Sequence, residues 1–376
     1  MSRILILTAG YGEGHNSAAR ALRTAFDEQP GVEAELVDLF ARKAPRLNDV
    51  TRRAYLGLIN RAPWIWSGVY GWLDRSRAAP LMFSALPGHV HLLQRIIAER
   101  KPVALVSTYP VYSWLLRRMK STGALPRHFT VVTDAITINS LWYRAPSAGW
   151  FVADADSAAI LTQGGVTADQ VHISGFPVAA AFADRPESLQ PPELSSGELP
   201  RVLYMINSGR DRALETARAL IAAGEWQLTI TAGRDVALQE ELRKLAQSAR
   251  GPIEILGWTE RIPELLMTHH GVISKAGGAT TQESINALCP MIVNQIVPGQ
   301  EEGNYELLRR HGAGTLAQTP GAIVSALRAA FASDAATWRN WRANLRKLAR
   351  PQAARMIART VLDEVAKPRE TAEMTR

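Results

Sequence analysis

The sequence predicts an α/β protein made of two Rossmann-like domains, whose parallel sheets face each other across a cleft. Short apolar strands alternate with helical segments as far as Ile173, and the alternation restarts at Arg201. The stretch between them, Arg185 to Pro200, is rich in Pro, Ser and Glu and is typical of a linker. We therefore expect an N-terminal domain over residues 1–185, a linker over 186–200, a C-terminal domain over 201–345, and a helix with a tail over 346–376.

The composition is that of an ordinary soluble globular protein, with 376 residues of which 47% are hydrophobic and 21% charged. The single cysteine, Cys289, excludes an intrachain disulfide and a cysteine-cluster metal site, and its apolar neighbours predict a buried thiol. No signal-peptide pattern precedes the first strand, and no uncharged apolar run reaches the ~18 residues of a membrane-spanning helix. A cytoplasmic location is the expectation.

The first strand, Arg3 to Thr8, is apolar on both faces, as in a parallel sheet covered by helices. Three alternating glycines follow between positions 10 and 14, which lets the backbone pass close to a ligand. Dinucleotide sites have similar loops, and either Glu35 or Asp38 could supply the acidic residue of such a site. The loop alone does not decide the ligand.

His15 stands at the start of the next helix, where the positive end of the helix dipole disfavours a cation. A neutral imidazole is what a general base requires, so His15 is a candidate catalytic residue. The alternative is a histidine that only caps the helix.

A second strand is predicted over residues 33–39. The rest of the first sheet is predicted from further short apolar runs, over residues 103–107, 129–133, 149–153 and 170–173. Asp134 follows the second of these runs at the carboxyl edge of the sheet, where open α/β folds bind their ligands. This carboxylate either faces a ligand or caps the next turn.

The net charge of +8 is concentrated in one segment, because residues 42–101 hold eleven Lys or Arg against three acids. Aromatic side chains and a cation are interleaved there with aliphatic ones, namely Arg61, Trp64, Trp66, Tyr70 and Trp72. Such a segment suits an anionic membrane surface. The alternative is a helix pair that packs its tryptophans into the N-terminal domain. Single-stranded nucleic acid is disfavoured, because no RNA-binding signature accompanies the aromatic residues.

The second half repeats the pattern, with predicted strands over residues 201–206, 227–231, 253–256, 271–273 and 291–293. After the fourth of these strands come a turn of small residues, Ser274 to Ala279, and a helix from Thr280. A strand, a glycine turn and a helix start direct free N–H groups and a positive dipole end at one spot, which favours a phosphate. Glu283 lies in the first turns of that helix, within reach of a ribose hydroxyl pair.

Three motifs occur in order, G-Y-G-E-G-H-N-S-A after the first strand and then K-A-G-G-A-T-T-Q-E and P-G-Q-E-E-G-N. Together they resemble the monogalactosyldiacylglycerol synthase and processive diacylglycerol glucosyltransferase family and, more distantly, the peptidoglycan transferase that makes lipid II. The resemblance covers residues 4 to about 324. It implies a GT-B fold, with the donor nucleotide on the C-terminal domain and the acceptor mainly on the N-terminal one. It further implies inverting transfer from a UDP-sugar, with no cofactor and no metal ion on the diphosphate.

Carried over residue by residue, the resemblance implies that His15 is the general base and that Glu283 binds the ribose. Gln300 and Glu301 would hold hexose hydroxyls, and Lys275 or Arg210 would help the helix N-terminus to stabilise the leaving UDP. The implied donor-binding residues are Gly12, Gly14, Ser208, Gly209, Trp258, Thr259, Lys275, Gly277, Gly278, Ala279, Thr280, Glu283, Gln300, Glu301 and Asn304. The implied acceptor and membrane residues are Asp134, Arg61, Trp64, Trp66, Tyr70 and Trp72.

Two segments depart from the family pattern. The glycine-rich loop expected after the first strand of the second domain is Ile206-Asn207-Ser208-Gly209-Arg210, and a histidine and aromatic run is replaced by residues 135–142. The predicted function is transfer of a hexose from UDP-glucose or UDP-galactose to diacylglycerol or a related lipid, on the inner face of the cell membrane. The alternatives are a soluble GT-B enzyme (a UDP-sugar epimerase or a small-molecule glycosyltransferase) and a non-catalytic lipid- or nucleotide-binding relative.

Overall fold

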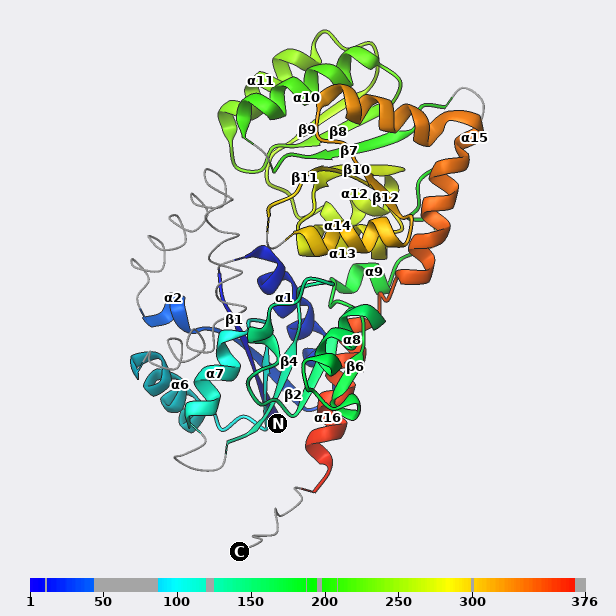
Figure 1. Ribbon diagram of the computed structural model, residues 1–376. Helices are drawn as coiled ribbons and strands as arrows, with labels where there is room; N and C mark the ends of the chain where they lie inside the picture. Colours follow the sequence, from blue (N-terminus) through cyan, green and yellow to red (C-terminus); the bar gives the residue numbers. More distant parts are fainter. Residues whose placement is uncertain are drawn as a thin grey trace, which may run out of the picture.

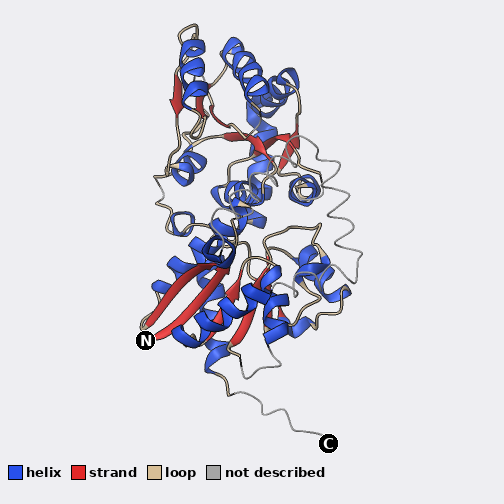
Figure 2. Cartoon of the chain, turned by 90° about the vertical axis from the view of Figure 1, so that its left-hand side faces the viewer, coloured by secondary structure: helices blue, strands red, loops and turns tan. Residues whose placement is uncertain are grey.

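Two parallel sheets, each of six strands, form the framework of the protein in a computed structural model (Figure 1). The structure describes residues 1–10, 12–43, 87–119, 125–186, 188–194, 198–207, 209–298 and 301–368. Seen after a 90° turn, the two sheets lie at different levels of the molecule, with helices between them (Figure 2). The predicted α/β fold with two Rossmann-like halves is confirmed.

The N-terminal sheet has the strand order β2-β1-β3-β4-β5-β6. Its strands are β1 (Ser2–Thr8), β2 (Val32–Asp38), β3 (Ala104–Ser107), β4 (Arg127–Val131), β5 (Gly149–Val152) and β6 (Val171–Ile173). Its described helices are α1 (Glu13–Asp27), α2 (Leu39–Lys43), α6 (Pro87–Arg100), α7 (Val111–Met119), α8 (Ala155–Gln163) and α9 (Ala180–Ala183). Ile4 and Ile6 pack on the side of α1, whereas Leu5 and Leu7 pack on the side of α6 and α7. The strand is buried on both faces because helices cover both faces.

The C-terminal sheet has the order β12-β11-β10-β7-β8-β9. Its strands are β7 (Arg201–Met205), β8 (Gln227–Thr231), β9 (Ile253–Leu256), β10 (Gly271–Lys275), β11 (Met291–Gln295) and β12 (Gly314–Leu316). Its helices are α10 (Arg210–Ala223), α11 (Val236–Ala246), α12 (Ile262–Thr268), α13 (Gly278–Ala287), α14 (Glu302–Arg310) and α15 (Pro320–Leu348). The order of strands reverses between β1 and β3 in one sheet and between β7 and β10 in the other. Ligands of such folds bind at these reversals.

The last helices of the chain, α15 and α16, lead from the C-terminal half back to the N-terminal half. Non-helical backbone angles at residues 332–335 bend α15, and α16 (Ala353–Ala366) then packs against α1. Ile357, Ala358 and Val361 are buried in the same core as Phe26 and Ile4. The helix expected to follow the C-terminal domain is thus part of the N-terminal core.

The two halves also share a core. One cluster of buried side chains joins Ala18, Ile136 and Phe182 of the N-terminal half to Ile285 and Leu307 of the C-terminal half. The carboxyl edges of the two sheets are therefore held close together. Among the described residues, no helix combines the length and the hydropathy that crossing a bilayer requires.

Candidate active site between the two halves

His15 projects from the first turn of α1 into the space between β1, β3 and β4. Its Nδ1 lies 2.8 Å from Oγ1 of Thr133, and its carbonyl oxygen accepts a hydrogen bond of 3.1 Å from the Thr108 hydroxyl. The rings of Tyr109 and Trp142 flank it at centroid distances of 5.1 and 6.1 Å. Because the imidazole bonds to Thr133 and not to the helix's own N–H groups, it does not act as a helix cap.

The electrostatic environment keeps His15 uncharged. Burial lowers the pKa of His15 from 6.5 to about 4, and an interaction of the ring with the Thr108 backbone offsets only part of this shift. Gly12 lies beside the opposite edge of the ring, where a Cβ atom would be 3.3 Å from Cδ2 and 3.7 Å from Nε2. With glycine at position 12, no side chain of that residue covers this edge of the ring.

The two acids that would suit a dinucleotide site have other partners. Asp38 accepts hydrogen bonds from the N–H groups of Gly10, Phe40 and Ala41. Glu35 forms ion pairs with two arginines, at 3.0 and 3.1 Å. Both carboxylates thus serve to hold the loop and the neighbouring helices in place.

The turn between β10 and α13 presents the N-terminus of α13 to the same space. Gly277 is the N-cap residue and supplies no side-chain hydrogen bond, so the first N–H groups of the helix have no side-chain cap. A Cβ atom on Gly277 would lie 3.5 Å from Lys275 Cε and 3.7 Å from Glu301 Oε1. Both charged groups thus adjoin the turn. Arg210, the other candidate cation, is paired with Glu241 at 2.6 Å.

Glu301 and Asn304 are fixed by short polar contacts at the start of α14. Lys275 Nζ lies 2.6 Å from Glu301 Oε1, and the N–H of Val297 donates to Glu301 Oε2 at 3.0 Å. The Asn304 amide donates to the carbonyl oxygen of Ala276 at 2.9 Å. Asn304, expected to bind the donor, is 4% exposed and supports the turn itself.

Glu283 points from α13 toward α1. Burial raises the pKa of Glu283 from 4.5 to about 7, while nearby Arg20 lowers it and Glu13 raises it. Both neighbours belong to α1, so this predicted ribose ligand lies where the two halves meet.

Three glycines lie where the two halves come close to each other. A Cβ atom on Gly14 would lie 3.7 Å from the Ala279 nitrogen, and one on Gly278 would lie 3.5 Å from the Thr133 carbonyl oxygen. One on Gly303 would overlap the carbonyl oxygen of Ala135. The helix that carries His15 and the helix that begins at the glycine turn therefore start side by side.

The turn of residues 135–137, against which Gly303 packs, has a strained backbone. Ile136 has a φ of 56°, a region that β-branched residues rarely adopt, and the Thr137 N–H donates to the Ala135 carbonyl at 2.6 Å. Strain of this kind persists where the surroundings fix it, commonly at functional sites. Here α14 on one side and α8, through Ser157 Oγ, on the other hold the turn.

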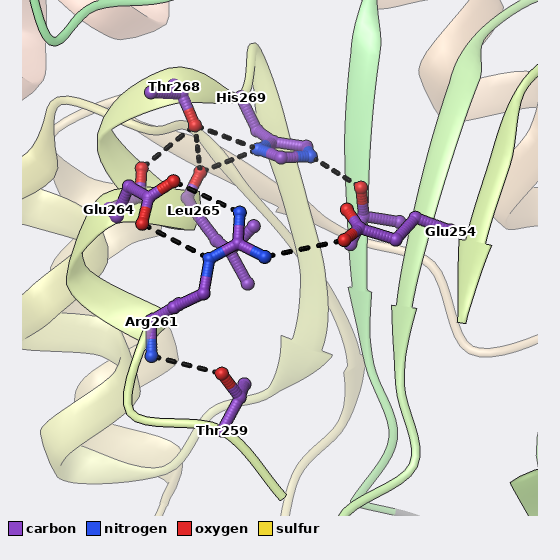
Figure 3. A network of polar contacts seen from close by, with 8 residues as sticks. Glu254, Thr259, Arg261, Glu264, Leu265, Thr268 and His269 are labelled. Atoms are coloured by element: carbon purple, nitrogen blue, oxygen red, sulfur yellow. Dashed lines mark hydrogen bonds and ion pairs between the residues drawn. The ribbon is translucent and has the colours of Figure 1, made fainter. Parts of the chain in front are cut away.

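The turn after β9 is held by a polar network centred on Arg261 (Figure 3). The guanidinium bonds to both oxygens of Glu264 and to Glu254, while the Arg261 N–H donates to Thr259 Oγ1 at 3.1 Å. Trp258 remains 59% exposed, with the Arg234 guanidinium 5.3 Å from its ring centroid. Trp258 and Thr259, two of the implied donor-binding residues, thus lie in a turn whose main chain is held in place by this network.

Other predicted residues are placed as follows. The Asn207 amide donates to Ser274 Oγ at 2.7 Å and ties the loop after β7 to β10, next to Gly209, the N-cap of α10. Asp134 Oδ2 accepts a 2.7 Å hydrogen bond from Trp142 Nε1. Ala279 and Thr280 lie in the first turn of α13. The predicted residues outside the described ones are Ser208, Gln300, Arg61, Trp64, Trp66, Tyr70 and Trp72.

Three further residues of this region have no functional signal in the sequence. Thr108 and Thr133 lie at the ends of β3 and β4, and a threonine there has no signal of its own in the sequence. Gly303 lies inside the P-G-Q-E-E-G-N motif, but its role depends on a contact with the other half.

Comparison with known sequences confirms the resemblance predicted from the motifs. Residues 15–178 match the family model of monogalactosyldiacylglycerol (MGDG) synthase. A processive diacylglycerol beta-glucosyltransferase of Bacillus thuringiensis (strain Al Hakam) is 24% identical over 371 residues, which cover 96% of this chain and 94% of the relative. The protein of the same name from Bacillus cereus (strain B4264) is 25% identical, covering 88% and 86%.

Comparison with solved structures shows a GT-B fold. MurG of Acinetobacter baumannii has a TM-score of 0.64 at 16% identity, over 96% of this chain and all of that one. A Phytolacca americana UGT2 complexed with UDP-2fluoro-glucose and pterostilbene has a TM-score of 0.63 at 13% identity, over 97% and 99%. The UDP-GlcNAc 2-epimerase of Neisseria meningitidis scores 0.60 at 11% identity, over 96% and 100%.

Proposed function

We propose that this chain, which resembles the MGDG synthase and processive diacylglycerol glucosyltransferase family, is an inverting glycosyltransferase that moves a hexose from a UDP-sugar to diacylglycerol. The observation that carries the proposal is the meeting of two helix starts at Gly14 and Ala279. One helix brings an uncharged imidazole whose Nε2 lies beside Gly12, and the other brings an N-terminus without a side-chain cap. A base and an anion site thus adjoin each other.

In this reaction Nε2 of His15 takes the proton of the acceptor hydroxyl while its oxygen forms a bond to the anomeric carbon. The bond between that carbon and the UDP oxygen breaks, and UDP leaves with the electron pair. The imidazolium then releases its proton to solvent. The diphosphate's negative charge raises the proton affinity of the neighbouring imidazole, which offsets the effect of burial.

The donor would lie along the C-terminal half. The N–H groups at the start of α13, with Lys275 nearby, would stabilise the charge that develops on the leaving diphosphate. Glu283 would hold the ribose, and Glu301 with Gln300 the hexose hydroxyls. UDP-glucose is an α-linked donor and the curated relatives carry the name beta-glucosyltransferase, which supports inversion and makes glucose the first hexose to test.

The acceptor would be reached at a membrane surface. Diacylglycerol stays in the bilayer, so the enzyme must bring its N-terminal half to the inner face of the cell membrane. The eleven cations of residues 42–101 and their interleaved aromatic residues support this role through attraction to anionic lipid. Co-sedimentation with anionic but not with neutral vesicles is the expected result, and no difference between the two would contradict it.

The direct test is incubation with radiolabelled UDP-glucose and diacylglycerol vesicles, in parallel with UDP-galactose. We expect a labelled glycolipid that is lost in His15→Ala and retained in His311→Ala, whose side chain is exposed on the far end of α14. Normal turnover in His15→Ala would refute the base assignment. UDP binding without any product would indicate a non-catalytic relative, and conversion of the free UDP-sugar would indicate an epimerase.

A further inference from the structure

The two nitrogens of the His15 ring have different surroundings. Nδ1 lies 2.8 Å from Thr133 Oγ1, whereas Nε2 borders the space left open by Gly12. In the part of the chain that the structure describes, no side chain is hydrogen-bonded to Nε2, and the Thr108 backbone also interacts with the ring. The substrate hydroxyl can therefore approach only the second nitrogen, which must carry a lone pair when it does so.

We propose that Thr133 is the positioning residue of the base, because its Oγ1 accepts the Nδ1–H of His15 and thereby keeps the proton off Nε2. The inference rests on the proposed function for its purpose, but the tautomer it specifies is a property of the protein alone. A neutral histidine has one N–H, so fixing that hydrogen at Nδ1 leaves Nε2 as an acceptor. The same bond fixes the ring plane against Tyr109 and Trp142.

A hydroxyl suits this position better than a carboxylate. A carboxylate beside Nδ1 would raise the pKa of the imidazole by favouring its charged form. The carboxylate nearest in sequence, Asp134, instead accepts a 2.7 Å hydrogen bond from Trp142 Nε1. A threonine can orient the ring without adding charge, so His15 stays unprotonated at neutral pH.

Thr133 also touches the donor half. Its carbonyl oxygen lies 3.5 Å from the Cβ position of Gly278, the first residue of α13. One residue thus contacts the base through its side chain and the predicted diphosphate turn through its main chain. Thr133 therefore lies both where the two halves contact each other and where the His15 ring is oriented.

The first test reads the tautomer directly by ¹⁵N NMR of the eight histidines, with the His15 signals assigned from their loss in His15→Gln. We expect a pyrrole-like Nδ1 and a pyridine-like Nε2 for His15 in the wild-type protein. In Thr133→Val the acceptor is gone, so the proton moves largely to Nε2, as in free neutral histidine. A wild-type protein with Nε2 protonated, or an unchanged tautomer in Thr133→Val, overturns the proposal.

The second half of the protein offers a matched control. Thr229 Oγ1 lies 2.9 Å from Nε2 of the buried His269, a hydroxyl–imidazole pair remote from His15. Thr229→Val is expected to shift the His269 signals and to leave those of His15 unchanged. A shift of the His15 signals in this variant would mean that the NMR response reports general loosening, which overturns the assignment to Thr133.

The kinetic test separates positioning from packing. Thr133→Val is expected to lower kcat at least about tenfold with little change in the KM for UDP-sugar, because only the base is affected. Thr133→Ser keeps the hydroxyl and is expected to restore most of the rate. Equal losses in both variants, or a loss confined to KM, would contradict the assignment. If no sugar transfer occurs at all, the proposed function fails, while the NMR result still decides the role of Thr133.

Discussion

Gly303 packs so closely on Ala135 that a Cβ atom at position 303 would overlap the Ala135 carbonyl oxygen. The contact joins the first turn of α14 to a strained turn of the other half, and Thr137 N would also lie 2.7 Å from the added carbon. A larger residue can be accommodated only if the two halves separate there.

We therefore expect Gly303→Ala to lower kcat/KM by about tenfold or more, equivalent to about 1.4 kcal/mol, because the base and the donor turn no longer meet. UDP affinity should change little, since most of the proposed nucleotide ligands lie within the C-terminal half. Gly321→Ala, whose Cβ would meet nothing within 4 Å, is the matched control and should retain full activity. Full activity in Gly303→Ala would show that catalysis does not use the closed arrangement.

Gly12→Ala tests access to Nε2 of His15. The backbone at Gly12 is extended, with φ −169°, so alanine fits the conformation but places Cβ 3.3 Å from the ring. We expect kcat to fall while the KM for UDP-sugar stays within about twofold. Steady-state assays and calorimetry of UDP binding measure the two effects. A fall in UDP affinity equal to the fall in kcat would contradict a specific effect on the base.

Glu283 should make donor binding depend on pH. Because the pKa of Glu283 is raised to about 7 in the free protein, much of it is protonated below that pH. An ionised carboxylate accepts hydrogen bonds from ribose hydroxyls better than a neutral one, so UDP affinity should rise from pH 6 to pH 8 with release of a proton. Calorimetry in buffers of different ionisation enthalpy measures that proton. In Glu283→Gln the dependence should disappear, and its persistence would point to another group.

Acid should destabilise the C-terminal half through His269 and His270. Burial lowers the pKa of both from 6.5 to about 4. The unfolded chain therefore binds protons first as pH falls, so the free energy of unfolding is level above about pH 6.5 and declines toward pH 4. Urea unfolding at pH 7.5, 6 and 5 measures this slope.

The variant His270→Ala tests whether this histidine causes the pH dependence of the free energy of unfolding. Nδ1 of His270 accepts from the Arg201 N–H at 2.9 Å, and Nε2 pairs with the Pro192 carbonyl. His270→Ala should lower stability at pH 7.5 by about 1–3 kcal/mol, because a buried N–H loses its acceptor, and should flatten the slope. The exposed His311→Ala should do neither. An unchanged slope in His270→Ala would assign the acid sensitivity elsewhere.

The sequence allowed the two sheets and the residues that follow their strands to be predicted, because buried parallel strands and glycine turns have local signatures. His15, Lys275, Gly277 and Glu283 all lie at the facing edges of the two sheets. Contacts made between distant segments left no such signature. The bond between Thr133 and His15 joins residues 118 positions apart, and the glycine at 303 matters only because the other half lies against it.

Two further contacts could not be predicted for the same reason. Asn304 stays a predicted donor ligand, but its amide also donates to the Ala276 carbonyl, 28 residues away in the sequence. The last helix was expected only to follow the C-terminal domain, because its own sequence does not show which element its apolar face packs against. Its apolar face is filled by α1 of the first domain.

That placement of α16 has a consequence for biosynthesis. Ile357 and Val361 are fully buried against residues synthesised some 330 positions earlier, and Arg355 bridges Glu28 and Asp184 by ion pairs at 2.6 Å. Until α16 has been synthesised, the N-terminal core lacks one of its covering helices, and the apolar side chains of α1 that pack against it are uncovered. The N-terminal domain is therefore made first but completes its core only after the C-terminal half has been made.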